Sequence, residues 1–247
     1  MMRTANPTLR AETFSGFAYT SVDGAMTIQG TVNKTAVLLA LAVLTAAWSW
    51  SRWDPANPSA VMPLVWGGAL GGFIVAMVTV FKRPWSPITA PLYALLEGLF
   101  LGAISAMMEM QFSGIVFQAV CLTFGTLLGL LMAYKSGLIR ATENFKLGIV
   151  AATGGIALVY IVSMVLGFFG MNIPLIHESG PVGIGFSLVV VVIAALNLVL
   201  DFDFIETGAE HRAPKYMEWY GAFGLMVTLV WLYIEILRLL AKMRSRD

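Results

Sequence analysis

The chain has few charged residues, and almost none of them fall inside its long apolar stretches. Charged side chains make up 12% of the 247 residues, against roughly 25% in soluble domains. Apolar residues make up 58%, and the mean hydropathy is +0.81. A soluble protein of this length would need more polar surface, so the composition predicts an integral membrane protein. The net charge of +1 gives no sign of a nucleic-acid partner.

Cysteine and histidine are also scarce. The single cysteine, Cys121, cannot form an intrachain disulfide. The sequence His177-Glu178-Ser179 lacks the second histidine of a zinc-protease motif, and no serine-hydrolase G-x-S-x-G motif occurs. An intramembrane aspartyl protease needs two aspartates from neighbouring spans, and only the span with Asp201 and Asp203 holds any. We therefore expect no enzymatic activity and no cofactor other than a calcium ion.

Seven apolar stretches run along the chain, joined by short polar loops. Each holds the roughly 20 residues that a helix needs to cross a hydrocarbon core of about 30 Å, and backbone in lipid must be helical or in a closed barrel. The sequence therefore predicts an all-α membrane protein, a seven-transmembrane-helix bundle. Its parts would be a polar N-terminal tail over 1–30 without a secretory signal, a transmembrane domain over 31–241 and a basic C-terminal tail over 242–247. The predicted spans are 31–50, 61–80, 88–110, 113–134, 147–169, 182–204 and 217–241.

Lysine and arginine are distributed unequally between the two sides. Ten lie in the N-terminal tail and the even-numbered loops, whereas the opposite loops carry only Arg52. Positive charge stays in the cytoplasm, so we expect a multi-pass plasma-membrane protein with a cytoplasmic N-terminus. Lys242, Arg244 and Arg246 then lie outside if the last span crosses fully. A last segment that dips in and returns is the alternative.

The few acids inside the spans are the candidate functional residues, because a charge in lipid is expensive and is retained mainly for function. Asp201 and Asp203 differ by about 200° of helical rotation, so they cannot share a face. We expect Asp201 to face the interior, with Asp203 and the nearby Glu206 at the rim. The alternative is that this cluster is only the hydrated end of a helix. The acids inside the spans are Glu97, Asp201, Asp203, Glu218 and Glu235.

The depth of these acids suggests which of them meet. A turn centred near His211 places Gly221 at the depth of Asp201, with Glu218 close by. Thr228 then lies about 10 Å deeper. Glu235 lies about another 10 Å deeper, where an ion pair with Arg238, three residues on, is its expected role. Glu97 lies near mid-bilayer, with no basic residue within a turn of it on its own helix. We therefore expect the Glu97 carboxylate to have a functional role.

The sequence resembles a known family. The short-looped spans, the segment 91–105 (PLYALLEGLFLGAIS) and the aspartate that ends the sixth span are similar to the Bax inhibitor/YccA family, also called the transmembrane BAX inhibitor motif family. The segments 3–7, 200–206 and 219–224 are similar to its actinobacterial branch. The resemblance covers about residues 31–241. It implies a seven-helix fold with the last helix central, and a pH-sensitive calcium leak.

The resemblance also implies site residues. The leak of the family is gated by two aspartates between the last two spans, with a basic counter-charge near the start of the third. Asp201 matches the first aspartate and is the candidate calcium ligand, and Lys82 or Arg83 matches the base. The second aspartate falls on Thr228 in an ungapped alignment or on Glu235 by local similarity, and depth favours Thr228.

The resemblance leads to two further expectations, one about the second carboxylate and one about an alternative function. Without a second aspartate, Glu97 or Glu218 would have to supply the other carboxylate that binds calcium or a proton. The alternative function is a non-transporting regulator that binds membrane proteases or other membrane complexes, as some bacterial relatives are thought to do.

Overall fold

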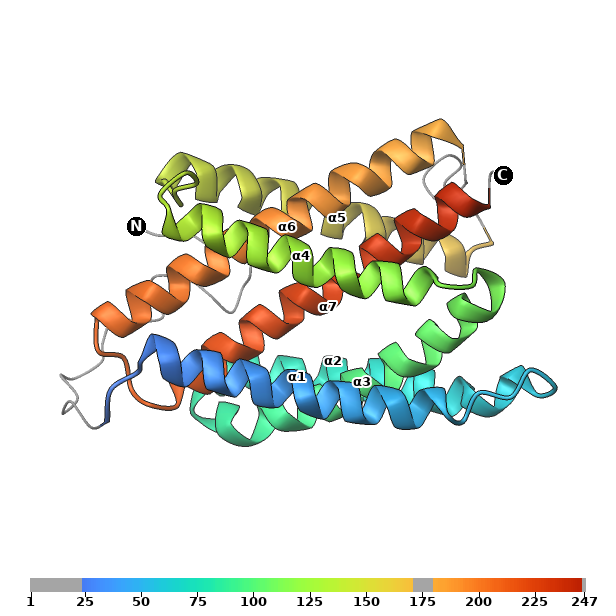
Figure 1. Ribbon diagram of the computed structural model, residues 1–247, viewed down its shortest axis with the longest axis horizontal. Helices are drawn as coiled ribbons and strands as arrows, with labels where there is room; N and C mark the ends of the chain where they lie inside the picture. The colour runs from blue at the N-terminus through green and yellow to red at the C-terminus, as the bar shows by residue number, and fades with distance from the viewer. Residues whose placement is uncertain (1–23, 171–179, 246–247) are drawn as a thin grey trace. The chain divides into compact units, whose positions relative to one another are not determined.

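The computed structural model describes residues 24–170 and 180–245, so the N-terminal tail before Gly24 and the segment around His177 lie outside the described residues. Seven α-helices are long and apolar enough to cross a membrane, and the described ranges hold no strand, only an isolated bridge between Ala25 and Pro214. The predicted all-α, seven-helix fold is confirmed (Figure 1). The helices are α1 (Ile28–Trp50), α2 (Met62–Phe81), α3 (Ser86–Gln111), α4 (Ile115–Lys135), α5 (Glu143–Phe168), α6 (Pro181–Glu210) and α7 (Met217–Arg244).

Most helix ends lie within a few residues of the predicted ones, and the largest difference is at the end of α6. This helix continues to Glu210, six residues beyond the apolar stretch, because a helix can leave the lipid and continue with polar side chains such as Glu206. At the other end of the chain, α7 runs to Arg244, so Lys242 belongs to a helix and not to a tail. Helix α1 begins at Ile28, where the Thr27 side chain caps the backbone N–H of Gly30 at 3.0 Å.

The chain divides into two compact units. Among the described residues, the α4–α5 unit holds residues 114–202 and 228–245, and the α1–α3 unit holds residues 24–113 and 203–227. Helices α6 and α7 each contribute one part to each unit. The most buried of the seven described helices is α7, with 67% of its most apolar stretch buried.

In the α1–α3 unit, α3 packs against both α1 and α2 (Figure 1). Gly98 and Gly102 of α3 lie directly against the backbone of α1, leaving no space for a side chain. On α2, Gly68 lies close to the backbone of α3, where a Cβ would be 2.7 Å from the carbonyl oxygen of Leu96. Gly68 of α2 therefore has the close-packing role typical of small residues in membrane helices.

In the α4–α5 unit, part of α6 packs against α5 and α7. Asn197 of α6 donates to the Thr153 hydroxyl of α5 at 2.9 Å. Lys242 of α7 donates to the Ser187 hydroxyl of α6, also at 2.9 Å. At Gly125 and Gly129 of α4, by contrast, nothing described lies within 4 Å of where a side chain would be.

Candidate functional site

Asp201 is buried in the α4–α5 unit, with 1% of its surface exposed. The Thr228 side chain of α7 interacts with its carboxyl group. Within this unit, however, neither carboxylate oxygen has a hydrogen-bond partner of ordinary length and angle. Two residues later Asp203 is half-buried, and Glu206 is exposed. The expectation that Asp201 faces inward while the other two lie toward the rim is confirmed.

The pairing of α6 with α7 differs from the depth count made on the sequence. That count placed Gly221 opposite Asp201, whereas the residue there is Thr228, seven positions further along α7. Gly221 lies instead beside Ile205, 3.3 Å from it measured from an ideal Cβ. The count failed because α6 runs to Glu210 and the loop is centred later than His211. Thr228 nonetheless faces Asp201, as we predicted when we compared the depths of Thr228 and Glu235 in the membrane.

Glu97 is buried in α3, with 9% of its surface exposed. Its Oε2 faces Gly72 of α2, 2.7 Å from the point that a Cβ would occupy. Tyr93, one turn earlier on α3, is its electrostatic neighbour. Within the described part of the α1–α3 unit, the Glu97 carboxylate makes no hydrogen bond or ion pair. Glu97 is thus a second buried acid in the middle of a membrane-spanning helix.

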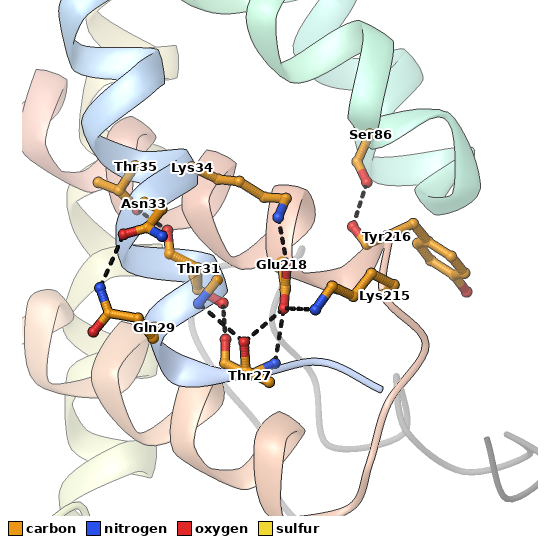
Figure 2. A network of polar contacts seen from close by, with 11 residues as sticks. Thr27, Gln29, Thr31, Asn33, Lys34, Thr35, Ser86, Lys215, Tyr216 and Glu218 are labelled. Carbon is orange, nitrogen blue, oxygen red and sulfur yellow. Dashed lines mark hydrogen bonds and ion pairs between the residues drawn. The ribbon is translucent and has the colours of Figure 1, made fainter. Parts of the chain in front are cut away.

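Glu218 has many partners, in contrast to Asp201 and Glu97. Lys34 of α1 forms an ion pair with its Oε2, and Lys215 forms one with its Oε1 at 3.0 Å (Figure 2). Thr27 donates to the same Oε1 from its backbone N–H at 3.0 Å and from its hydroxyl at 2.8 Å. Gly30 is required beside it, because a side chain there would collide with the carboxylate. We name Thr27, Lys34, Lys215 and Glu218 the Glu218 cluster.

The Glu218 cluster connects segments that lie far apart in the sequence. Residues 24–27 dock on the α6–α7 loop, where Met26 N–H donates to the carbonyl oxygen of Ala213 at 2.6 Å. The expectation that Glu218 lies at the depth of Asp201 was wrong: it belongs to the first turn of α7, ten residues before Thr228. Sequence reasoning missed Thr27, Lys34 and Lys215. The lysine three residues before Glu218 was the available signal.

Arg83 and Lys82, the candidate counter-charges, lie in the turn between α2 and α3. The Arg83 guanidinium stands 5.9 Å from the centre of the Tyr220 ring at the start of α7, whereas Lys82 is exposed. Ser86 donates to the carbonyl oxygen of Tyr216 at 2.9 Å, which fixes this turn against the α6–α7 loop (Figure 2). Burial raises the pKa of Tyr216, and the positive charge of Arg83 opposes that rise.

Glu235 forms the predicted ion pair with Arg238, at 3.1 Å. The structure adds a partner that the sequence did not suggest: the Tyr160 hydroxyl of α5 donates to Glu235 at 2.9 Å, and Arg238 donates to the same hydroxyl at 2.9 Å. These three side chains tie α5 to α7. Glu235 therefore has fixed partners of its own, two helical turns beyond Thr228.

Comparison with protein families matches residues 6–245 to the family described as Bax inhibitor 1 like. The chain belongs to this family. Comparison with curated proteins and with solved structures gives no match. In this Bax inhibitor 1-like protein, the expected pairing of Asp201 with Glu97, Glu218 or Arg83 stays a prediction, because these three residues and Asp201 belong to different units.

The acids of this Bax inhibitor 1-like protein form no clustered metal centre. No group of three or more His, Cys, Asp or Glu side chains able to hold a metal occurs among residues 24–170 and 180–245. Asp201 and Thr228 offer a carboxylate and a hydroxyl, both hard oxygen ligands of the kind that calcium prefers. Calcium takes about 6–8 oxygen ligands, so these two side chains alone do not form a complete calcium site.

Proposed function

We propose that this Bax inhibitor 1-like protein is a pH-sensitive leak for cations, including calcium, and that Asp201 binds the ion or proton. The observation that carries the proposal is a buried carboxylate whose oxygens make no hydrogen bond of ordinary length and angle within its unit. A buried carboxylate is costly unless it is paired, protonated or bound to a cation. Exchange of a cation and a proton at Asp201 would meet that requirement.

The chemistry of the site explains why the leak would respond to pH. Calcium binds carboxylate and hydroxyl oxygens, and protons compete with it for the carboxylate. Protonation of Asp201 removes a calcium ligand and also releases any counter-charge, such as Arg83, that pairs with it. The response of the leak to pH should therefore depend on Asp201, and it should be lost when an amide replaces the carboxylate.

The other acids in or near the spans have different roles in the proposal. Glu97, also without a hydrogen-bond partner within its unit, is the second proton or cation site. Asp203 and Glu206 lie nearer the rim and would only attract cations. Glu218 already binds two ammonium groups, so we assign it a structural role.

The alternative function is a non-transporting regulator that binds membrane proteases or other membrane complexes. One observation favours it: Glu218 and Glu235 are both neutralised by fixed cations, as in a static scaffold. Either function would operate in the plasma membrane with a cytoplasmic N-terminus, as the distribution of basic loops suggests. Neither function requires a catalysed reaction or a cofactor.

Calcium flux into liposomes that contain the purified protein tests the proposal, at pH 6 and at pH 8. The wild type should admit calcium at rates that differ between the two values, and Asp201→Asn should remove most of that difference. Glu206→Gln, an exposed acid five residues further along α6, is the matched control and should keep it. Absence of flux from every form, with the protein folded, would favour the regulator.

A further inference from the structure

Lys242 is a lysine that the fold buries, with 7% of its surface exposed. Its Nζ donates to the hydroxyl oxygen of Ser187 at 2.9 Å and to the carbonyl oxygen of Gly183 at 3.2 Å, both at the start of α6. Ser187 itself is 1% exposed. Two oxygen atoms that carry no charge therefore bind the ammonium group inside the α4–α5 unit.

The register between α6 and α7 places Lys242 there. Ser187 comes fourteen residues before Asp201 on α6, and Lys242 comes fourteen residues after Thr228 on α7. The two contacts, Asp201 with Thr228 and Ser187 with Lys242, are thus the two ends of one regular antiparallel pairing, about 21 Å long. We name this pairing the α6–α7 seam. Between these two contacts, Val190 and Ala194 of α6 and Leu232 of α7 are buried.

Two charged groups of α7 influence Lys242. Glu235, two turns earlier on the same face of α7, attracts the ammonium group, and Arg238 between them repels it. Arg238 is itself bound to Glu235 and Tyr160, which directs its guanidinium toward α5. The Lys242 end of the seam therefore combines a carboxylate nearby with carbonyl and hydroxyl oxygens in contact.

Carbonyl and hydroxyl oxygens are the ligands with which proteins replace the hydration shell of monovalent cations. We propose that the Gly183 carbonyl and the Ser187 hydroxyl form a binding site for a small monovalent cation of the ammonium type, which the charge of Glu235 favours from a distance. Lys242 fills this site as a tethered ammonium ion and closes that end of the seam to free cations. The proposal holds whether or not the protein conducts calcium.

Chemical rescue tests the site in the full-length protein. Lys242→Ala removes the tether and leaves space for a free ion, so its melting temperature in detergent should fall by several degrees. Butylammonium chloride, which restores both the stem and the ammonium group, should recover at least half of that loss. Tetramethylammonium at equal concentration, which cannot donate a hydrogen bond, should not. Lys215→Ala, which removes a lysine with a 53% exposed side chain, is the control and should show no recovery.

The second measurement keeps Lys242 in place and so does not depend on the folding of the alanine variant. Amine acetylation followed by mass spectrometry should label Lys215 quickly and Lys242 slowly in the wild type. Ser187→Ala removes one oxygen of the site, so it should raise labelling of Lys242 relative to Lys215 at least threefold. Equal labelling in the two proteins, or a Lys242→Ala variant that butylammonium does not stabilise, would overturn the proposal.

Discussion

The carboxylate of Glu97 on α3 occupies the space that a side chain at Gly72 on α2 would need. A Cβ at position 72 would lie 2.7 Å from Oε2 of Glu97. One turn earlier, Gly68 faces the α3 backbone in the same way. The glycine face of α2 therefore does two things: it lets the helices approach, and it leaves a recess for a buried acid.

Gly72→Ala should destabilise the protein, because the added methyl group competes with the Glu97 carboxylate for that recess. Overpacking of this kind costs about 1–3 kcal/mol, which thermal unfolding in detergent would detect. Gly67→Ala is the control on the same helix. Nothing described lies within 4 Å of that position, so the change should be neutral or stabilising by up to ~1 kcal/mol through helix propensity.

The double variant Gly72→Ala/Glu97→Ala separates the two contributions. If the collision is with the carboxylate, removal of Glu97 should make the change at position 72 nearly neutral. Equal melting temperatures for Gly72→Ala and Gly67→Ala would show that the Glu97 carboxylate does not fill the space beside Gly72.

The Glu218 cluster predicts a ranking of stabilities. Glu218→Gln should be the most damaging change, by about 3–5 kcal/mol, because it leaves two ammonium groups without their carboxylate. Lys34→Met should cost less, since Glu218 keeps Lys215 and Thr27. Lys215→Met should cost less than about 1 kcal/mol, because this side chain is 53% exposed. A Lys215 effect as large as that of Glu218 would contradict the ranking.

The positions of the helices could be predicted from the sequence far better than the contacts between them. Lipid excludes charge over some 20 residues at a time, and this leaves a strong local signal for each span. The Glu235–Arg238 pair was also predictable, since both residues lie on one helical turn. Glu218, in contrast, is bound by Thr27, 191 positions away, and no local pattern indicates such a partner.

The register of α6 against α7 shows the same limit. It depends on where α6 ends, and the apolar stretch stops six residues before the helix does. An error of that size in one helix end displaced the counted partner of Asp201 from Thr228 to Gly221. Depth along a hairpin can therefore be counted only when both helix ends are known.

Arg83→Ala should raise basal calcium leak in liposomes if Arg83 is the counter-charge of the closed state. The change removes a guanidinium that lies over Tyr220 at the start of α7, so it also frees that helix end. Lys82→Ala, the neighbouring exposed cation, is the control and should leave the leak within about twofold of wild type. Equal effects of both changes would indicate a general surface-charge effect.

The orientation can be tested with reporter fusions. The ten-to-one excess of basic residues predicts that fusions after Arg83 and Arg140 report the cytoplasm, whereas one after Pro174 reports the outside. A fusion after Arg244 distinguishes a last helix that crosses fully, reported outside, from one that returns. The reverse pattern at the first three sites would refute the cytoplasmic N-terminus.

Glu235→Gln should lower the stability of the protein and leave the pH response of the flux intact, whereas Asp201→Asn should remove the pH response with little loss of stability. Glu235 is held by Arg238 and Tyr160, so its amide variant should unfold at a lower temperature, because a buried hydrogen-bonded ion pair is broken. Its pH-dependent flux should remain, since its carboxylate is not free to exchange ions. Asp201 has only its contact with Thr228 to lose within its unit, so Asp201→Asn should unfold within a few degrees of wild type while its flux no longer changes between pH 6 and pH 8. The opposite assignment of the two phenotypes would show that the ion site lies at Glu235.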